Sequence, residues 1–428
     1  MKCRHCQSQI TRTLIDLGSA PPSNSYLTHV TLRRPEKWFP LNVVVCDSCW
    51  LVQAEAYSRA AELFNEEYAY FSSFSFQWLK HAEAYVHDMV ERFALSSDSL
   101  IIEVASNDGY LLQYVEGRGI KCLGIEPTAS TAAAARLKGI DTIEEFFGTE
   151  LATRLASSGQ QADLMAANNV LAHVPDINDF AKGFSTLLKP HGVATFEFPH
   201  LLNLIKEVQF DTIYHEHFSY LSLTTVNAIF AANGLSVFDV EEHPTHGGSL
   251  RVFAQRADTG KQASTDRLRE MLQREEITGM RSGAFYSDYQ SKAEKVKDDF
   301  LSFLIKARRD GKKVAAYGAA AKGNTLLNFA GVRPDLLPFV VDKNPSKQGK
   351  FMPGSRIPIV DEARLQSEKP DYVVLLPWNL YSELSTQLDY IRQWGGKFVT
   401  RQRLVLRHPS ELPVFFSAGP VAARRRLV

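Results

Sequence analysis

The stretch from Ser99 to Pro127 restricts the fold of this chain more than any other. An apolar run at 99–104 predicts a buried strand, and a turn of small residues and a helical segment follow it directly. A second apolar run, at 122–125, ends in Glu126. Strand, tight turn, helix and a strand that ends in an acid form the dinucleotide-type half-fold, in which the acid accepts hydrogen bonds from ribose hydroxyls. The stretch therefore predicts an α/β domain.

The turn in this unit departs from the G-x-G-x-x-G pattern. Ala105 and Ser106 stand where glycines are expected, and only Gly109 remains. Without glycines there is no evident cradle for a pyrophosphate, which disfavours NAD and FAD. S-adenosylmethionine fits better, because it carries a ribose and an adenine but no phosphate. The residues expected to bind this cofactor are Glu103, Ala105, Asn107, Gly109, Tyr110, Glu126 and Pro127.

The alternation of helix and strand continues to about residue 260. A predicted strand at 162–169 ends in Asn168 and Asn169, and His173 follows closely. Ligands meet an open α/β sheet at its strand ends, so these three residues join the expected cofactor site. The helix, turn and strand over 178–200 match the late half of a methyltransferase sheet. Two further strands, after a helix that Gly234 closes, fit the antiparallel end of such a sheet.

Four of the five cysteines form two C-x2-C pairs, which 39 residues separate. Each pair fits a tight knuckle turn, and two knuckles supply four thiolates to one tetrahedral Zn²⁺. A metal with four protein ligands has no open position for water, so the ion is expected to be structural and to fold this segment. Four unrelated thiols are the alternative, and His5 is a weaker alternative ligand. The expected ligands are Cys3, Cys6, Cys46 and Cys49.

The segment 211–220 gathers groups that can pass protons. It holds Tyr214, His215, Glu216, His217 and Tyr220, with few charges that would keep it in solvent. A histidine is the usual general base near neutral pH, and a neighbouring Tyr or Glu can orient it or donate to a developing oxyanion. A polar turn with one buried histidine is the structural alternative. Metal binding by the two histidines is another, but no third ligand is close in sequence.

A second strand–turn–helix unit begins near residue 312. Its glycines, Gly318 and Gly323, are spaced as in a phosphate loop, but Asn-Thr follows them instead of Lys-Thr, so an ATP site is not predicted. Backbone N–H groups at the helix start, with Lys322 beside them, could still receive a diphosphate. Further apolar strands at 337–342 and 371–377 predict a small Rossmann-like domain. A packing or dimerisation domain with a tight glycine turn is the alternative.

The motifs in this order resemble the S-adenosylmethionine-dependent sugar C-methyltransferases of deoxysugar biosynthesis. The resemblance spans nearly the whole chain and rests on the cysteine pairs, the stretches 103–110, 124–127 and 169–176, and the motifs 214–218, 246–251 and 317–324. It implies methyl transfer to a carbon, typically C3, next to the ketone of a nucleotide-linked 4-keto-6-deoxy sugar. The implied catalytic residues are Tyr214, Glu216, His217 and Tyr70. The implied substrate-binding residues are His246, Ser249, Arg251, Lys322 and Asn324.

The chemistry implied for these residues is the formation of a carbon nucleophile. A sugar C–H becomes acidic only when an adjacent carbonyl accepts the charge as an enolate. His217 is expected to be the base, and Tyr214 and Tyr70 are expected to donate to the enolate oxygen. Glu216 is expected to orient His217 or to hold a sugar hydroxyl. An NAD(P)-dependent sugar oxidoreductase and a zinc-knuckle module for RNA or protein remain as alternatives.

Length and composition restrict the partners and the location expected for this chain. The chain has 428 residues, of which 45% are hydrophobic and 22% charged, with 48 basic and 48 acidic side chains. Balanced charge points away from nucleic acid and anionic membranes, and the absence of a leader or of a run of about 20 apolar residues predicts a cytoplasmic protein. A monomer or a homodimer is expected. The predicted parts are a zinc-binding domain (1–70), a class I methyltransferase Rossmann-like domain (71–262), a C-terminal Rossmann-like domain that binds the nucleotide sugar (263–408) and a tail (409–428).

Overall fold

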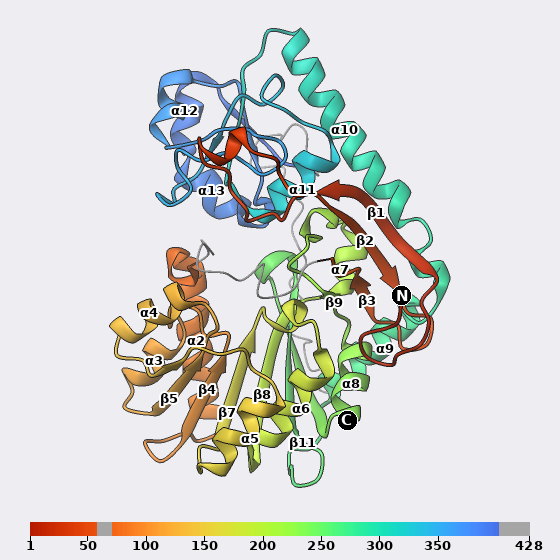
Figure 1. Cartoon of the computed structure of the whole chain (residues 1–428), viewed down its shortest axis with the longest axis vertical. Coiled ribbons are helices and arrows are strands. Elements are labelled where there is room, and N and C mark those ends of the chain that lie inside the picture. The colour runs from red at the N-terminus through yellow and green to blue at the C-terminus, as the bar shows by residue number, and fades with distance from the viewer. Residues whose placement is uncertain (58–70, 402–428) are drawn as a thin grey trace, which may run out of the picture.

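Three β-sheets organise the protein (Figure 1). The structure is a computed structural model that describes residues 1–57 and 71–401. A seven-stranded sheet lies in the middle of the sequence, a five-stranded sheet follows it, and a four-stranded sheet begins at the N-terminus. The α/β fold predicted from the sequence is thereby confirmed.

The seven-stranded sheet has the order β10-β11-β8-β7-β4-β5-β6. β6, β5, β4, β7 and β8 run parallel, whereas β11 is antiparallel to both β8 and β10. The two last strands thus form one end of the sheet, as predicted, but only β11 is reversed. The strands are Leu100–Val104 (β4), Lys121–Ile125 (β5), Thr142–Ile143 (β6), Ala162–Asn168 (β7), Leu188–Pro199 (β8), Leu235–His243 (β10) and Ser249–Arg256 (β11).

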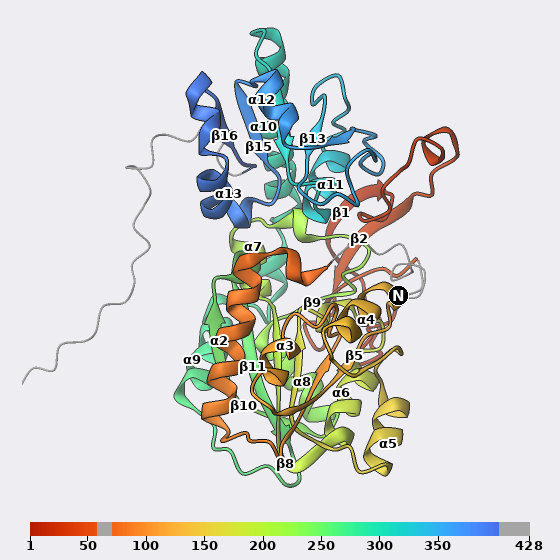
Figure 2. The ribbon, with the colours of Figure 1, turned by 90° about the vertical axis from the view of Figure 1, so that its left-hand side faces the viewer.

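Helices cover both faces of this sheet, as a parallel sheet requires (Figure 2). On one face, α2, α3 and α4 bury a cluster that includes Tyr85, Leu112 and Phe253. On the other face, α5, α6, α8 and α9 bury a second cluster around Phe184, Phe196 and Phe230. The helices are Phe76–Arg92 (α2), Leu112–Glu116 (α3), Ala129–Leu137 (α4), Thr149–Ser157 (α5), Ile177–Leu187 (α6), Leu201–Lys206 (α7), Leu223–Ala232 (α8) and Asp266–Thr278 (α9).

The C-terminal sheet is wholly parallel, in the order β14-β13-β12-β15-β16. A chain that leaves the middle of a parallel sheet and returns on both sides is the Rossmann-like arrangement that the sequence predicted. The long helix Tyr289–Arg309 (α10) leads into it. Its other elements are Val314–Tyr317 (β12), Ala321–Phe329 (α11), Val340–Val341 (β13), Ile359–Val360 (β14), Ala363–Glu368 (α12), Tyr372–Leu375 (β15), Tyr381–Gln387 (α13) and Lys397–Val399 (β16).

The N-terminal sheet joins the other two parts. Arg12–Ala20 (β1), Phe39–Val45 (β2) and Val52–Ala54 (β3) are antiparallel, and the fourth strand is Ser219–Tyr220 (β9), from the central part of the chain. The loop between β1 and β2 reaches the C-terminal domain, where Leu27 exchanges backbone hydrogen bonds of 2.9 and 2.8 Å with Phe351. Strand β1, this loop and strand β2 together make up most of the segment between the two cysteine pairs.

The spacing of Gly318 and Gly323 has a packing explanation. Gly318 has a φ of 89°, and a Cβ there would lie 2.4 Å from Cδ of Pro377. A Cβ on Gly323 would lie 2.8 Å from Cβ of Leu376. Both glycines therefore let α11 approach the chain that follows β15, and the close approach of helix to strand accounts for the pattern without a triphosphate.

No helix in the described ranges 1–57 and 71–401 has the length and apolar character needed to cross a membrane.

Gly318→Ala should destabilise the protein more than Gly311→Ala. Both residues have positive φ, but nothing lies within 4 Å of a Cβ at Gly311. Backbone strain costs each variant about 1–2 kcal/mol, and the clash with the rigid Pro377 ring adds about 1–3 kcal/mol at Gly318. Denaturant midpoints of the two variants measure the difference. Equal midpoints would show that Pro377 does not constrain this turn.

Candidate active site

A cavity of about 1610 Å³ opens between the central and C-terminal sheets, and Asn24 of the N-terminal part also lines it. A site for one drug-sized ligand has about 300–1,000 Å³. The volume here is large enough for two ligands side by side. The strand ends of β4, β5 and β7 contribute to one wall, and the start of α11 and the segment 377–387 contribute to another.

The turn after β4 keeps the shape of a glycine-rich loop without the glycines. Ala105 has a φ of 58° and Asn107 a φ of 49°, in the left-handed region that glycine usually occupies. The carboxylate of Glu126 holds the turn by accepting hydrogen bonds from the N–H of Asn107 (3.0 Å) and of Thr128 (2.9 Å). Burial raises the pKa of Glu126, and these donors oppose the rise. Ala105, Asn107, Glu126 and the adjacent Pro127 all line the cavity, as a nucleoside site requires.

Polar groups at the end of β7 remain available to a ligand. Asn168 donates to the hydroxyl of Tyr110 (3.4 Å), and Asn169 contacts Nε2 of His246 (3.1 Å). The side-chain oxygens of both asparagines are buried and lack a hydrogen-bond partner in the described part of the chain. Since both asparagines line the cavity, these oxygens fit the amino or hydroxyl groups of a cofactor.

Two residues expected at the cofactor lie elsewhere. Glu103 is fully buried within β4, and Gly109 lies behind the turn; neither lines the cavity. A Cβ on Gly109 would lie 2.4 Å from Cδ1 of Ile140, so this glycine admits the segment around Ile140. Their sequence positions next to the turn could not show that neither residue faces the cavity.

The hydrogen bonding of His217 gives its imidazole a defined tautomer. Nδ1 of His217 lies 2.8 Å from the carbonyl oxygen of Thr212, so it carries the proton and Nε2 is left as an acceptor. Burial and the neighbouring His173 lower the pKa of His217 well below its usual value. The ring of Tyr214 lies over that of His217, with centroids 3.9 Å apart. Both side chains line the cavity, so the structure brings a neutral histidine and a phenol together there.

Glu216 does not orient His217, contrary to one of the two roles considered for it. Its carboxylate accepts a hydrogen bond of 2.8 Å from Nδ2 of Asn24, and the carbonyl of Thr212 holds His217 instead. Burial raises the pKa of Glu216 to about 7, with Asn24 opposing the rise. Glu216 lines the cavity, which leaves the second role, contact with a sugar hydroxyl, open to it.

The other histidines near His217 differ in whether they face the cavity. His215 turns away from the cavity, with Nε2 lying 3.2 Å from the carbonyl oxygens of Phe39 and Pro40. It therefore cannot share a metal with His217. His173 lines the cavity, and its Nδ1 lies 2.9 Å from the carbonyl oxygen of Glu216. Burial lowers the pKa of His173 to about 4. Tyr70 lies outside the described residues.

Of the five residues expected to bind substrate, Lys322 and His246 line the cavity. The ammonium group of Lys322 donates to Oδ1 of Asn379 (3.1 Å) and has no carboxylate within ion-pair distance in the described ranges. Burial lowers the pKa of Lys322 to about 8, and the charge of Asp211 opposes the decrease. Burial also lowers the pKa of His246, to about 4. At Lys322 the cavity wall thus carries a cation with no ion-pair partner in the described ranges, which can meet an anion.

The other three expected substrate contacts are corrected by the structure. Arg251 is buried and pairs with Glu197 (2.8 Å), so its charge is already neutralised. Ser249 is buried and donates to the carbonyl of Thr245. Asn324 is buried inside α11. None of the three lines the cavity. Arg251 and Ser249 instead hold strand β11 and the turn that carries His246.

Sequence reasoning missed several residues of the site. Asn24 lies in a loop rich in Pro and Ser, and His81 lies on α2, where its Nε2 contacts the carboxylate of Glu197 at 2.8 Å. Lys347 lines the cavity from the C-terminal domain. For the contact between His81 and Glu197, the only indication in the sequence was the position of Glu197 among polar residues at the end of β8. Nothing near Asn24 or Lys347 in sequence indicates a site.

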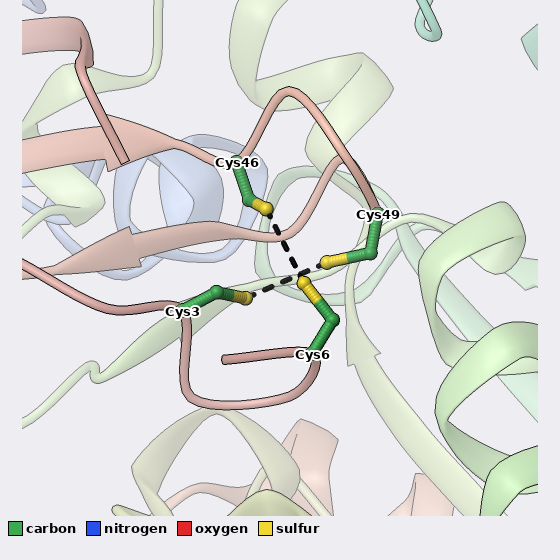
Figure 3. A group of neighbouring side chains, drawn as sticks. All are labelled: Cys3, Cys6, Cys46 and Cys49. Carbon is green, nitrogen blue, oxygen red and sulfur yellow. Dashed lines mark hydrogen bonds between the residues drawn. The ribbon is translucent and has the colours of Figure 1, made fainter. Parts of the chain in front are cut away.

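The four cysteines of the paired motifs meet in one group (Figure 3). Their Sγ atoms all lie within 4.8 Å of one another, with 3.5 Å between Cys3 and Cys49 and between Cys6 and Cys46. A Zn²⁺ bound tetrahedrally at a Zn–S distance of 2.3 Å separates its sulfurs by about 3.8 Å. The residues therefore fit a structural zinc ion, as predicted. In the described ranges no other group of three or more candidate ligands lies together.

The strand order and the residues at the ends of β4, β5 and β7 define an S-adenosylmethionine-dependent methyltransferase. A methyltransferase domain model matches residues 78–240, a zinc-binding domain model matches 3–64, and the model of a C-methyltransferase C-terminal domain matches 244–401. C-methyltransferase NovU from Streptomyces niveus is 34% identical over 398 residues, which cover 93% of this chain and 94% of that protein. The chain belongs to this family of C-methyltransferases with an N-terminal zinc-binding domain.

Solved structures of methyltransferases are also similar to part of the chain. Magnesium protoporphyrin IX methyltransferase from Synechocystis PCC 6803 is 15% identical, covering 42% of this chain and 88% of that chain with a TM-score of 0.34. A methyltransferase from Clostridium acetobutylicum is 11% identical, covering 42% and 92% with a TM-score of 0.35. The family match decides between the three functional classes left open by the sequence: the protein is a C-methyltransferase.

Cys46→Ser should remove the zinc ion and impair catalysis through strand β9. The knuckle of Cys46 and Cys49 lies between β2 and β3, and Val52 of β3 pairs with Tyr220, three residues after His217. Metal analysis of the purified wild type should give about one zinc per chain, and the variant should contain none and lose N-terminal structure. Cys122→Ser is the matched control, since Cys122 lies on β5, away from the cluster. A wild type that folds without metal would contradict the assignment.

Proposed function

We propose that the enzyme methylates the carbon next to the ketone of a nucleotide-linked 4-keto-6-deoxy sugar, at C3. The observation that carries this proposal is the set of groups that line the large cavity described above. A nucleoside-type loop, a neutral histidine with a free Nε2, and an unpaired lysine ammonium all face it. These groups match, in turn, a methyl donor, an acidic C–H and a diphosphate.

His217 is the proposed base. Nε2 of His217 takes the proton from the sugar carbon, and the electron pair of that C–H bond moves onto the carbonyl oxygen as an enolate. Because Nδ1–H stays bonded to the Thr212 carbonyl, the imidazolium that forms is held in place. Burial favours the neutral imidazole, which keeps the base free at neutral pH and makes the imidazolium short-lived. When bound, S-adenosylmethionine supplies an activated methyl group to the carbon nucleophile.

Tyr214 is the proposed donor to the enolate oxygen. Its ring lies against His217 on the cavity wall, so the base and the donor can address neighbouring atoms of one sugar ring. A donor placed where negative charge develops contributes about 10²–10³-fold to the rate. Glu216, fixed by Asn24, is the proposed acceptor for a sugar hydroxyl.

Lys322 and the start of α11 are the proposed site of the diphosphate. The N–H of Ala319 already donates to Asp342, and that of Ala320 donates to the carbonyl of Gly318. These two amides are therefore not available to phosphate, and the ammonium group of Lys322 is the proposed main attraction. A lysine ammonium serves as a point charge for phosphate oxygens. Placing the diphosphate at the C-terminal domain leaves the sugar to extend toward His217.

His217→Ala should lose methyl transfer and the exchange of the substrate C–H in deuterated water. General-base catalysis contributes about 10²–10⁴-fold, so transfer should fall by that factor. Binding of S-adenosylhomocysteine should be unchanged, as calorimetry can measure. His215→Ala is the matched control, because this buried histidine faces away from the cavity. Exchange at the wild-type rate in His217→Ala would clear His217 of the base role.

The pH profile of kcat/KM should be bell-shaped. The pKa of Glu216 is raised to about 7, so its carboxylate forms, and activity increases, as the pH rises through that value. The pKa of Lys322 is lowered to about 8, so the cation is lost, and activity falls, as the pH rises through that value. Glu216→Gln should remove the acid limb, and Lys322→Arg should remove the alkaline limb. A profile with both limbs intact in both variants would refute these two assignments.

A further inference from the structure

Asp211 is a buried carboxylate that does not line the cavity. It accepts a hydrogen bond of 2.6 Å from Nε1 of Trp378, and Nε of Arg401 lies 2.9 Å from its other oxygen. The side chains of Asp211 and Arg401 are each about 1% exposed. Arg401 also donates to the carbonyl of Val208 at 2.6 Å. A carboxylate of the central domain is thus enclosed by two residues of the C-terminal domain.

Trp378 connects this carboxylate to the cavity. The ammonium of Lys322 lies 5.0 Å from the centre of the indole, and the guanidinium of Arg401 lies 4.7 Å from it. Gly247, with a φ of 94°, packs against the same ring, since a Cβ there would lie 2.6 Å from Cη2 of Trp378. The indole is therefore fixed by its N–H to Asp211 and by the turn after His246, and it presents an aromatic face to Lys322.

Among the described residues, Asp211 supplies the negative charge that acts on Lys322. Burial lowers the pKa of Lys322, the negative charge of Asp211 raises it, and the positive charge of Arg401 lowers it. His217 and His246 also face this group, but burial keeps both neutral near pH 7 by lowering their pKa values. Tyr289 faces Asp211 and Arg401, and burial raises its pKa, so it too is uncharged. Asp211 is then the anion on which the protonation of Lys322 depends.

We propose that Asp211 is a positioning residue for the phosphate end of the substrate: it fixes Trp378 beneath Lys322 and supplies the countercharge that keeps the Lys322 ammonium cationic. This inference rests on the proposed function, because it takes Lys322 as the diphosphate site. Asp211 also begins the segment whose next residue, Thr212, orients His217 through its carbonyl. The residue that supports the proposed anion site is thus followed directly in the chain by the residue that orients the base.

The test is the pH dependence of anion binding, which does not require turnover. Inorganic pyrophosphate, dTDP, GDP and CDP are titrated by calorimetry into the full-length zinc-containing protein with S-adenosylhomocysteine present, from about pH 6 to about pH 10. Affinity of the wild type should fall as the pH rises through about 8, the pKa of Lys322. Asp211→Asn should shift this fall in affinity to lower pH, so that binding near the wild-type midpoint becomes about tenfold weaker. Arg401→Gln should shift the fall to higher pH.

Two further variants separate charge from packing. Asp239→Asn is the control, because Asp239 is another buried aspartate that pairs with arginines, Arg92 and Arg267, and does not line the cavity. This variant should leave the pH at which affinity falls unchanged. In the Lys322→Arg variant the affinity for anions should no longer fall near pH 8. Adding Asp211→Asn to that variant should not restore the fall. If Asp211→Asn does not fold, Trp378→Phe carries the test: without the N–H that binds Asp211, pyrophosphate binding should weaken, and unchanged affinity would overturn the positioning role.

The outcomes are distinguishable. Two results would overturn the role of Asp211 and leave the proposed function standing. In one, the fall in affinity near pH 8 does not move in Asp211→Asn. In the other, it does not shift to higher pH in Arg401→Gln. A wild type that binds neither pyrophosphate nor any of the three nucleoside diphosphates overturns both the role of Asp211 and the assignment of Lys322 to the diphosphate.

Discussion

The hydrogen bond from Nδ1 of His217 to the carbonyl oxygen of Thr212, 2.8 Å long, is the contact on which the site depends. It fixes the proton on one ring nitrogen and leaves the other as an acceptor at the cavity. Burial adds the second condition, because it keeps the imidazole neutral when the pH is near 7. A base that is free, oriented and partly shielded from water is the component that a carbon nucleophile requires and that a sulfonium methyl donor does not bring.

The rest of the architecture holds the segment that carries this contact. Strand β3 of the zinc-binding part pairs with β9, directly after the motif. Asn24 reaches Glu216 from a loop that also docks on the C-terminal domain. From that domain, Thr325 donates to the carbonyl of Ile213 at 2.7 Å. The N-terminal and the C-terminal parts therefore both contribute direct bonds to residues 213–220 of the central part, which explains why a methyltransferase sheet alone does not make this site.

Local patterns carried the sequence-based predictions that the structure confirms. Apolar runs between turns predicted the strands, and paired cysteines predicted the metal cluster, because knuckle spacing is a local property. Asn168 and Asn169 were found because polar residues at the end of an apolar strand stand out. Ala105 shows a limit of this approach: it takes the positive φ of the glycine it replaces, so the loop geometry survives a substitution that the sequence pattern treats as a break.

The errors arose where partners are distant in the sequence. Arg251 follows a glycine turn and suggests a substrate contact, yet its partner is Glu197, on the neighbouring strand β8. The glycines at 318 and 323 are spaced as in a phosphate loop, although no ATP site was predicted there, and the side chains of Pro377 and Leu376 account for both of them. The contact between Asn24 and Glu216 joins residues 192 positions apart. Only tertiary packing determines such pairs, so composition and spacing could not reveal them.

The most direct test of the account is a crystal structure of the enzyme with S-adenosylhomocysteine and a nucleoside diphosphate bound together. We expect the nucleoside of the first ligand at Glu126 and the phosphates of the second at Lys322, with a gap of one sugar ring between the sulfur and Nε2 of His217. A structure in which the two ligands leave no such gap, or in which another side chain separates His217 from the sulfur, would contradict the central claim.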